Sequence, residues 1–335
     1  YIPELGHNVS VTDYAHTLYI RASWTDFNPQ EDVYGWKIDS NLRAYIEGAY
    51  QRNMRLAFRV VVDSRDKRTE FTPQFVKDAG AKGFMNKGKW SPYSDDSVFQ
   101  KYYTKFVKAL AKDFNDPSKV EFIDGFGLGK WGEYHTMIYS TGDDTPKKAV
   151  FDWVTDIYSQ AFDKVPVVIN YHRWIGAGKD WVDDEHFAVD SEEMLEEAIK
   201  KGYSLRHDAF GMTTYYGSWE RRFAKKYRNI CPIIMEGGWI VKSHSYWQDP
   251  RGYRKDSHED VRRGEFDDSK EAHVNMMDFR FGDTESWFKD AFDLVRRFLR
   301  EGGYRLYPSE ISLPLEVSKK TTPTIKHCWN NLGWG

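Results

Sequence analysis

The sequence predicts an α/β fold, a (β/α)8 TIM barrel, on three observations. Apolar strand-like segments alternate with amphipathic helical segments seven times along the 335 residues, and such alternation is typical of a parallel sheet with helical crossovers. An open doubly wound sheet often carries a glycine-rich phosphate loop after its first strand, and no loop of the G-x-G-x-x-G or G-x-x-x-x-G-K-[ST] type is expected in this chain. The length also suits a closed barrel, which takes about 250 residues plus insertions.

The predicted strands are short runs of apolar and β-branched residues. The run at 54–62, MRLAFRVVV, is nearly continuous, which fits a strand covered on both faces. The run at 120–129 ends in glycines, and the run at 231–236 ends in a carboxylate. In chain order, strands are expected at 18–24, 54–62, 120–129, 165–171, 203–207, 231–236 and 304–307. Because these are seven, the first barrel strand is expected to be missing or irregular at the N-terminus.

The segments between these strands repeat apolar residues about every 3.6 positions, which predicts helices. Asp39 or Ser40 can cap the start of the first helix. In chain order, helices are expected at 38–52, 98–114, 149–162, 191–201, 219–227 and 285–300. The polar, glycine-containing connection at 63–95 is expected to be functional, because loops of that length are uncommon in compact domains.

Residues 1–310 are expected to form the catalytic barrel. Residues 311–335 are expected to begin a C-terminal β domain, because the segment HCWNNLGWG has strand-like and turn-like residues. Both ends of the chain look cut. No signal peptide is visible, and the chain opens on Tyr1 rather than Met.

Composition and charge narrow the class of protein. Lys plus Arg number 48 and Asp plus Glu 51, for a net charge of −3, which argues against a partner held by phosphate neutralisation, such as nucleic acid. No apolar run approaches the ~20 residues of a membrane span. Cys231 and Cys328 cannot make a disulfide framework, and Cys231 is expected to be buried packing. The pair Arg262 and Arg263 is expected on a solvated helix face.

Aromatic residues make up 16% of the chain, and part of them is expected to line a sugar-binding cleft. Two carboxylates stand out at predicted strand ends, where barrel enzymes carry their chemistry. Glu133 follows Trp131 and Gly132, and Glu236 ends the run CPIIME before two glycines. A buried strand that ends in an ionisable group requires partners for that group. Paired carboxylates at an aromatic-lined barrel mouth suggest glycoside hydrolysis.

Other polar and aromatic residues at strand ends are candidate substrate-binding groups. Trp131 and Trp239 rank highest among the aromatic ones because each lies within three residues of a candidate carboxylate. Arg206 and Asp208 have an alternative role as a structural ion pair. The candidate substrate-binding set is Arg21, Trp24, Arg59, Trp131, His135, Asn170, His172, Arg206, Asp208 and Trp239.

The stretch ASWTDFNPQEDVYGWKID resembles the W-x-x-x-x-P-x-x-G-x-Y-x-W pattern after the second strand of family-42-type β-galactosidases, in clan A of the retaining glycoside hydrolases. It is also similar to related bacterial barrel domains that continue into a β-sandwich. The resemblance implies that Glu133 is the acid/base, that Glu236 is the nucleophile and that Arg21 supports the nucleophile. One departure is Gly132, where the clan usually has an Asn that contacts the sugar.

The sequence therefore predicts a retaining hydrolase of β-linked glycosides or polysaccharides, a β-galactoside or a β-glucan, acting through a covalent glycosyl-enzyme intermediate. Exo and endo action both stay open. An oligo- or polysaccharide substrate suggests a secreted, periplasmic or cell-surface setting.

Two alternatives stand beside this prediction. One is a non-catalytic carbohydrate-binding barrel module of a larger polysaccharide-handling protein, favoured by the missing Asn before Glu133. The other is a metal-dependent barrel hydrolase, although the sequence has no H-E-x-x-H, H-x-H or C-x-x-C motif. On that ground no cofactor and no metal are expected.

Overall fold

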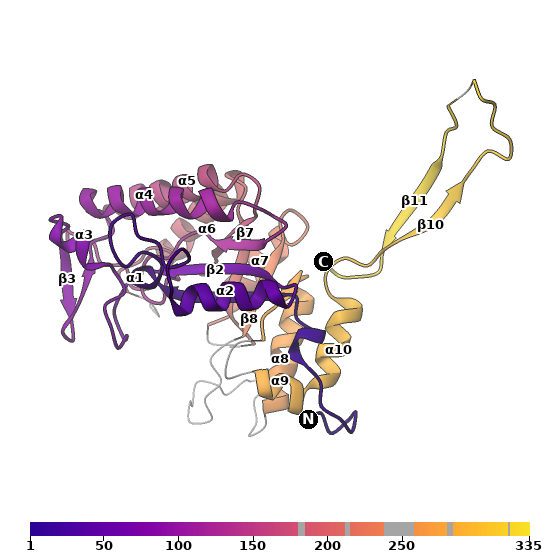
Figure 1. Cartoon of the computed structure of the whole chain (residues 1–335), viewed down its shortest axis with the longest axis horizontal. Helices are drawn as coiled ribbons and strands as arrows, with labels where there is room; N and C mark the ends of the chain where they lie inside the picture. The colour runs from indigo at the N-terminus through magenta and orange to yellow at the C-terminus, as the bar shows by residue number, and fades with distance from the viewer. Residues whose placement is uncertain (180–184, 212–214, 238–257, 280–283, 321) are drawn as a thin grey trace. The chain divides into compact units, whose positions relative to one another are not determined.

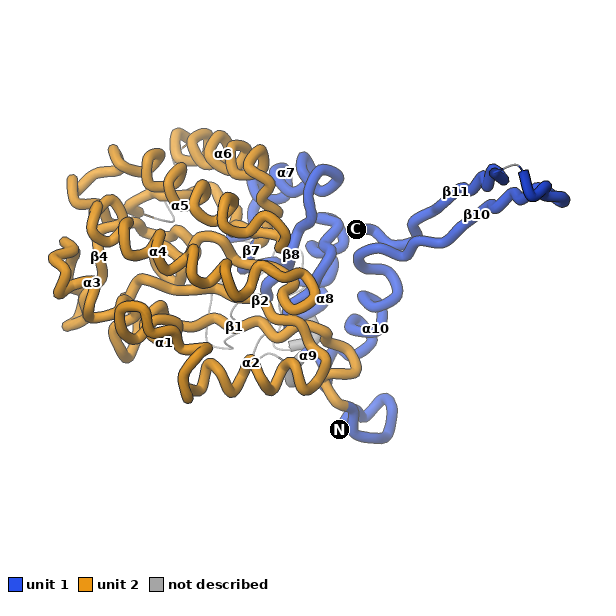
Figure 2. The backbone as a smooth tube through the Cα atoms, turned by 45° about the horizontal axis from the view of Figure 1, so that its top comes forward, with its two compact units in different colours: residues 1–9, 207–335 blue, residues 10–206 orange. Residues whose placement is uncertain are grey.

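The computed structural model describes residues 1–179, 185–211, 215–237, 258–279, 284–320 and 322–335 (Figure 1). The chain divides into two units, one made of residues 10–206 and the other of residues 1–9 and 207–335 (Figure 2). Among the described residues, no helix is both long enough and apolar enough to cross a membrane.

The larger unit alternates strands and helices. Its elements are η1 (Val11–Asp13), β1 (Thr17–Ser23), α1 (Trp24–Phe27), α2 (Asn41–Gln51), β2 (Arg55–Val61), α3 (Gln74–Asp78), β3 (Gly83–Asn86), β4 (Lys89–Pro92), α4 (Ser97–Phe114), β5 (Val120–Asp124), α5 (Lys147–Ala161), β6 (Val167–Asn170), α6 (Glu185–Lys200) and the start of β7 (Ser204–Phe210). The predicted connection at 63–95 thus contains a short helix and the antiparallel hairpin β3–β4.

The smaller unit continues the alternation. It holds the end of β7 and then α7 (Ser218–Tyr227), β8 (Ile233–Gly237), α8 (His258–Glu271), β9 (Met276–Met277), α9 (Thr284–Asp290), α10 (Phe292–Glu301), β10 (Leu306–Ser312) and β11 (Lys326–Asn331). The helix predicted at 285–300 is divided between α9 and α10 at Ala291.

Strand order identifies the fold class. The seven-stranded sheet has the order β1-β2-β5-β6-β7-β8-β9, which follows the order along the chain. The pairs β1–β2, β2–β5, β5–β6, β6–β7 and β8–β9 are all parallel. A doubly wound sheet reverses its order at a switch point, whereas a (β/α) barrel keeps sequential order with a helix after each strand. The fold is therefore TIM-barrel-like, as predicted.

The strand predicted at 304–307 is not part of this sheet, so that prediction was wrong. The seventh sheet strand is β9, a two-residue strand that is too short for periodicity to detect. Residues 306–312 form β10, which pairs antiparallel with β11 in a hairpin of its own. Both strands of the hairpin are exposed along their length. The proposed domain boundary at residue 310 stays a prediction.

The strands β2, β5 and β6 are mostly buried on both faces, and near their carboxyl ends one face is apolar while the other carries polar side chains. Phe58 on β2 packs against Phe27 and Phe114, the last residue of α4. Trp24 lies in the same layer, fully buried against Phe99 and other rings of the unit. Side chains two residues apart on a strand point to the same face, and the residues next to Phe58 belong to the other, polar face that carries the candidate site.

Candidate active site

Glu133 is carried by a loop with an unusual backbone, between β5 and α5. Seven of its residues have positive φ, at 43–78°: Gly127, Gly129, Trp131, Gly132, Tyr134, Thr136 and Gly142. Three of these are not glycine, and a left-handed conformation is costly for residues with a Cβ. The loop is closed by backbone hydrogen bonds from Lys130 N to His135 O and from Tyr134 N to Leu128 O, both 2.9 Å. Strain of this kind concentrates at functional sites.

The expectation that the chain lacks a G-x-G-x-x-G motif was wrong, because the glycines at 127, 129 and 132 have that spacing. In a dinucleotide-binding loop that spacing opens directly into a helix. Here the next helix, α5, begins only at Lys147, so the helix N-terminus that would bind a phosphate does not follow. The glycines serve the left-handed turns around Glu133 instead.

Gly132 explains the departure from the clan pattern. Its φ is +73°, and a Cβ there would lie 3.2 Å from Val61 Cγ2 and 3.4 Å from Arg59 Cδ. An Asn at this position would be strained and crowded at once. A side chain at 132 that recognised a sugar hydroxyl would therefore require Val61 or Arg59 to shift.

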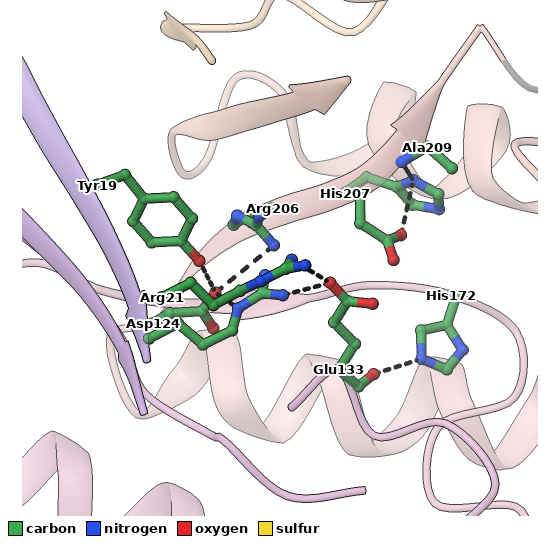
Figure 3. Close-up of polar contacts among 10 residues, drawn as sticks. Tyr19, Arg21, Asp124, Glu133, His172, Arg206, His207 and Ala209 are labelled. Carbon is green, nitrogen blue, oxygen red and sulfur yellow. Dashed lines mark hydrogen bonds and ion pairs between the residues drawn. The ribbon is translucent and has the colours of Figure 1, made fainter. Parts of the chain in front are cut away.

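Glu133 is held by two arginines from neighbouring strands (Figure 3). Its Oε1 accepts a hydrogen bond from Arg21 Nη1 at 3.2 Å and another from Arg59 Nη1. Glu133 is only 4% exposed and Arg59 is completely buried, whereas Arg21 is partly exposed. Two guanidinium groups stabilise the carboxylate anion over the neutral acid. The two contacts also fix the orientation of the Glu133 carboxylate.

Asp124, the last residue of β5, completes the charged network. Its Oδ2 accepts from Arg59 Nε at 2.6 Å and from the Tyr19 hydroxyl at 3.0 Å, and it pairs with Arg206 Nη1 at 3.5 Å. Burial raises the pKa of Asp124 even though Arg59 and Tyr19 oppose the rise. The pKa of Arg59 lies well above its ordinary value because Asp124, Tyr19 and Glu133 outweigh its burial.

His172 fixes the backbone of Glu133. Its Nε2 lies 2.9 Å from the Glu133 carbonyl oxygen, and its Nδ1 lies 3.2 Å from the Trp174 backbone nitrogen. A carbonyl only accepts and a backbone N–H only donates, so the ring is the neutral Nε2–H tautomer. It also stacks on His135, with ring centroids 4.0 Å apart. These contacts give His172 a positioning role rather than the expected contact with substrate.

A sugar platform requires an accessible ring, and Trp131 stays a candidate for this requirement because the residue is partly exposed. The Lys130 ammonium lies 4.3 Å from the ring centroid on one side, and His135 packs against the ring at 5.7 Å. Trp24 does not meet it. That side chain is fully buried among rings that include Phe75 and Phe106, so it has no face for a sugar. The expectation for Trp24 was wrong, since it begins α1 and points into the core.

Asn170, the last residue of β6, is 3% exposed. Neither its amide oxygen nor its amide nitrogen has a hydrogen-bond partner among the described residues. Buried polar side chains in folded proteins are nearly always paired, so the amide of Asn170 departs from the general rule.

The smaller unit carries the other candidates. Glu236 lies on β8 and is almost fully buried. His207 and Asp208 lie on β7, with His207 Nδ1 3.7 Å from Asp208 Oδ1 and accepting from Ala209 N at 3.1 Å. Trp239 lies outside the described residues. The expectation of a solvated Arg262 was wrong, because that side chain is fully buried and paired with Glu265 on α8.

The sequence analysis missed two members of the network, Tyr19 and Asp124. Both carried a usable signal. Tyr19 is two residues before Arg21 on the same strand, so the two side chains share a face. Asp124 ends the apolar run VEFID, the same pattern that drew attention to Glu236.

Comparisons with known proteins describe the fold. No family model matches the chain, and no curated protein is similar to it in sequence. Solved structures of glycoside hydrolases are similar in fold. The endo-1,4-β-xylanase of Caldicellulosiruptor owensensis is 11% identical with a TM-score of 0.42, covering 85% of this chain and 77% of the xylanase. Xylanase XynB of Paenibacillus barcinonensis is 8% identical with a TM-score of 0.49, covering 80% and 77%.

Endo-glycoceramidase II of Rhodococcus sp. is 13% identical with a TM-score of 0.47, covering 90% of this chain and 75% of its own. At these identities and TM-scores the likenesses carry no argument about activity. The resemblance to family-42-type enzymes and the C-terminal β-sandwich stay predictions, and so do the absence of a cofactor, a metal and a nucleic-acid partner.

Proposed function

We propose that this protein is a retaining glycoside hydrolase acting on β-linked glycosides, with Glu133 and Glu236 as its two catalytic carboxylates. The observation that carries the proposal is the burial of Glu133 together with its contacts to two arginines. A buried carboxylate on a left-handed loop, held by Arg21 and Arg59, is organised at a cost that a merely structural loop does not need. Glu236 supports it, as a buried carboxylate on a parallel strand of the same fold.

The chemistry is a double displacement. One carboxylate attacks the anomeric carbon and expels the leaving alcohol, which takes a proton from the other carboxyl group. The resulting glycosyl ester is cleaved by water, which gives its proton back to that second group. Because both displacements invert the anomeric carbon, the product keeps the β configuration.

The resemblance assigns the acid/base role to Glu133 and the nucleophile role to Glu236. The two arginines on Glu133 favour the opposite allocation, since a nucleophile works as an anion and a general acid must first hold a proton. The allocations differ in one measurable outcome. Azide added to an alanine variant of the acid/base gives a β-glycosyl azide, whereas azide added to an alanine variant of the nucleophile gives the α-azide.

The substrate is proposed to be a β-galactoside or a β-glucan oligosaccharide, and a secreted, periplasmic or cell-surface location is proposed with it. A panel of aryl β-glycosides and β-glucan oligosaccharides tests the activity. For any substrate that is cleaved, proton NMR of the first product formed tests the mechanism. The β-anomer is expected first, and an α-anomer would contradict retention.

A non-catalytic sugar-binding barrel is the second candidate. The pairing of Glu133 with two arginines and the lack of a side chain at position 132 are the observations that favour it. Sugar binding measured by calorimetry without turnover of any panel substrate would establish it.

A further inference from the structure

We infer that Asn170 is a specificity-determining residue, whose side-chain amide binds the hydroxyl groups of the bound sugar. The inference rests on the proposed function and names a contact within it. The starting observation is that both polar atoms of this nearly inaccessible side chain have no hydrogen-bond partner among the described residues.

Strand register places Asn170 on the polar face of the sheet. Arg59 pairs with Asp124, Asp124 pairs with Val168, and Asn170 follows Val168 by two residues. Paired residues of parallel strands and residues two apart on a strand point to the same face. Asn170 therefore faces the same side as Arg59 and Asp124. Its own register partner is Arg206, which reaches Asp124 on that face.

The position of Asn170 along the strand matters as well. It is the last residue of β6. It lies two residues closer to the carboxyl end of that strand than Val168, the register partner of Asp124. Active sites of barrel enzymes lie at the carboxyl ends of the strands. Asn170 thus lies on the polar face, at the end where substrate binds.

The unpaired amide of Asn170 differs from the amide of a buried Asn that supports the fold. A buried Asn that stabilises the fold makes hydrogen bonds, as Asn28 does, since its Nδ2 donates to Gln30 O at 2.6 Å and to Val33 O at 2.8 Å. Asn28 is 4% exposed and Asn170 is 3% exposed, so burial does not distinguish them. An amide left without partners is costly unless a ligand or water completes it.

The chemistry of the amide defines what it binds. It offers two N–H donors and one acceptor oxygen with no charge. A hydroxyl both donates and accepts, so a neutral sugar with one hydroxyl, or a pair of adjacent hydroxyls, matches this group. A sugar that lacks the hydroxyl would leave the amide buried and unpaired, and sites of this kind reject such analogues strongly.

The experiment compares Asn170→Leu, Asn170→Asp and the matched control Asn28→Leu. Leu has a similar shape but no polar atom, and Asp keeps the acceptors without the donors. Each variant is measured for thermal unfolding and for kcat/KM on the best aryl β-glycoside and on its monodeoxy analogues. The control Asn28→Leu is expected to lower the melting temperature and to leave the preference among analogues unchanged.

Asn170→Leu is expected to unfold at the same or a higher temperature than the unsubstituted protein. The unsubstituted protein is expected to disfavour one monodeoxy analogue by at least about tenfold, and Asn170→Leu to reduce that ratio to about one. The ratio measured for Asn170→Asp is expected to lie between the ratio of the unsubstituted protein and that of Asn170→Leu. A lowered melting temperature for Asn170→Leu, or an unchanged ratio, would overturn the inference.

The experiment distinguishes failure of the proposed glycosidase activity from failure of the inference about Asn170. If the unsubstituted protein cleaves no glycoside of the panel, the activity is wrong, and Asn170 is then tested by calorimetric binding of the same glycosides. Binding that is weaker in Asn170→Leu at an unchanged melting temperature supports the inference, and equal binding refutes it.

Discussion

Arg59 and Asp124 face each other on neighbouring parallel strands, with Arg59 Nε 2.6 Å from Asp124 Oδ2 and both side chains fully buried. The same guanidinium group also contacts Glu133. One buried cation therefore serves two buried carboxylates, and the position of the candidate catalytic group depends on it.

Arg59→Met is expected to lower the free energy of unfolding by about 3–5 kcal/mol, because it leaves two buried carboxylates without their shared partner. Turnover is expected to be lost with it. Chemical denaturation measures the first effect. Arg43→Met is the control, since Arg43 pairs with Glu47 on the exposed surface of α2. An exposed ion pair of this kind contributes about 0.5 kcal/mol or less to the free energy of unfolding. Equal effects in the two variants would contradict the account.

Gly132→Ala is expected to remove most activity, since its Cβ would press on Val61 and on Arg59 and displace Glu133. Gly142→Ala is a matched control. Gly142 also has a positive φ, +78°, but a Cβ there meets nothing within 4 Å. In both variants the left-handed backbone conformation of the new alanine lowers the free energy of unfolding by about 1–2 kcal/mol, and calorimetry measures this loss. Only Gly132→Ala should also lose turnover, and loss of turnover in Gly142→Ala would show that general destabilisation is responsible.

Trp24 and Trp131 are expected to respond in opposite ways. Trp24→Ala empties a site packed by aromatic rings and should cost about 3–5 kcal/mol of stability. Trp131→Ala removes a partly exposed ring and should change stability by under about 1 kcal/mol, while raising KM for an oligosaccharide. Thermal unfolding and steady-state kinetics on both variants check this. A KM unchanged in Trp131→Ala would remove Trp131 from the substrate site.

Cys231 is expected to be unreactive. Burial raises the pKa of its thiol to about 11, so at pH 8 only about 0.1% of it is thiolate, the nucleophilic form. Cys328 is exposed on β11. Iodoacetamide at pH 8 followed by mass spectrometry should label Cys328 first and Cys231 only on unfolding. Cys231 is half-buried rather than fully buried as expected, and its rapid labelling in the folded protein would contradict the raised thiol pKa.

Much of the fold could be predicted because the signals were local. Apolar runs such as 54–62 and the 3.6-residue period of 98–114 mark β2 and α4 closely. The sequence alone did not identify β9, whose two residues gain their strand character only from pairing with β8. It also placed residues 304–307 in the sheet, because strand propensity does not specify which strand is the partner.

The candidate site was predictable in part. Position at a strand end pointed to Glu133, Arg59 and Asn170. The roles of Trp24 and His172 depend on where their side chains point and on which backbone groups lie opposite, and these follow from tertiary packing. Gly132 shows the limit most clearly, because its positive φ and the closeness of Val61 and Arg59 to the place of a Cβ disfavour any other residue there.

Turnover by Glu133→Gln tests the central claim most directly. Gln keeps the shape of Glu133 and its acceptor oxygen for Arg21, but it neither attacks an anomeric carbon nor exchanges a proton. On the best glycoside of the panel, with folding verified by circular dichroism, the account predicts that kcat falls by at least about a thousandfold, and that Glu236→Gln behaves in the same way. A folded Glu133→Gln variant that retains full turnover would contradict the account.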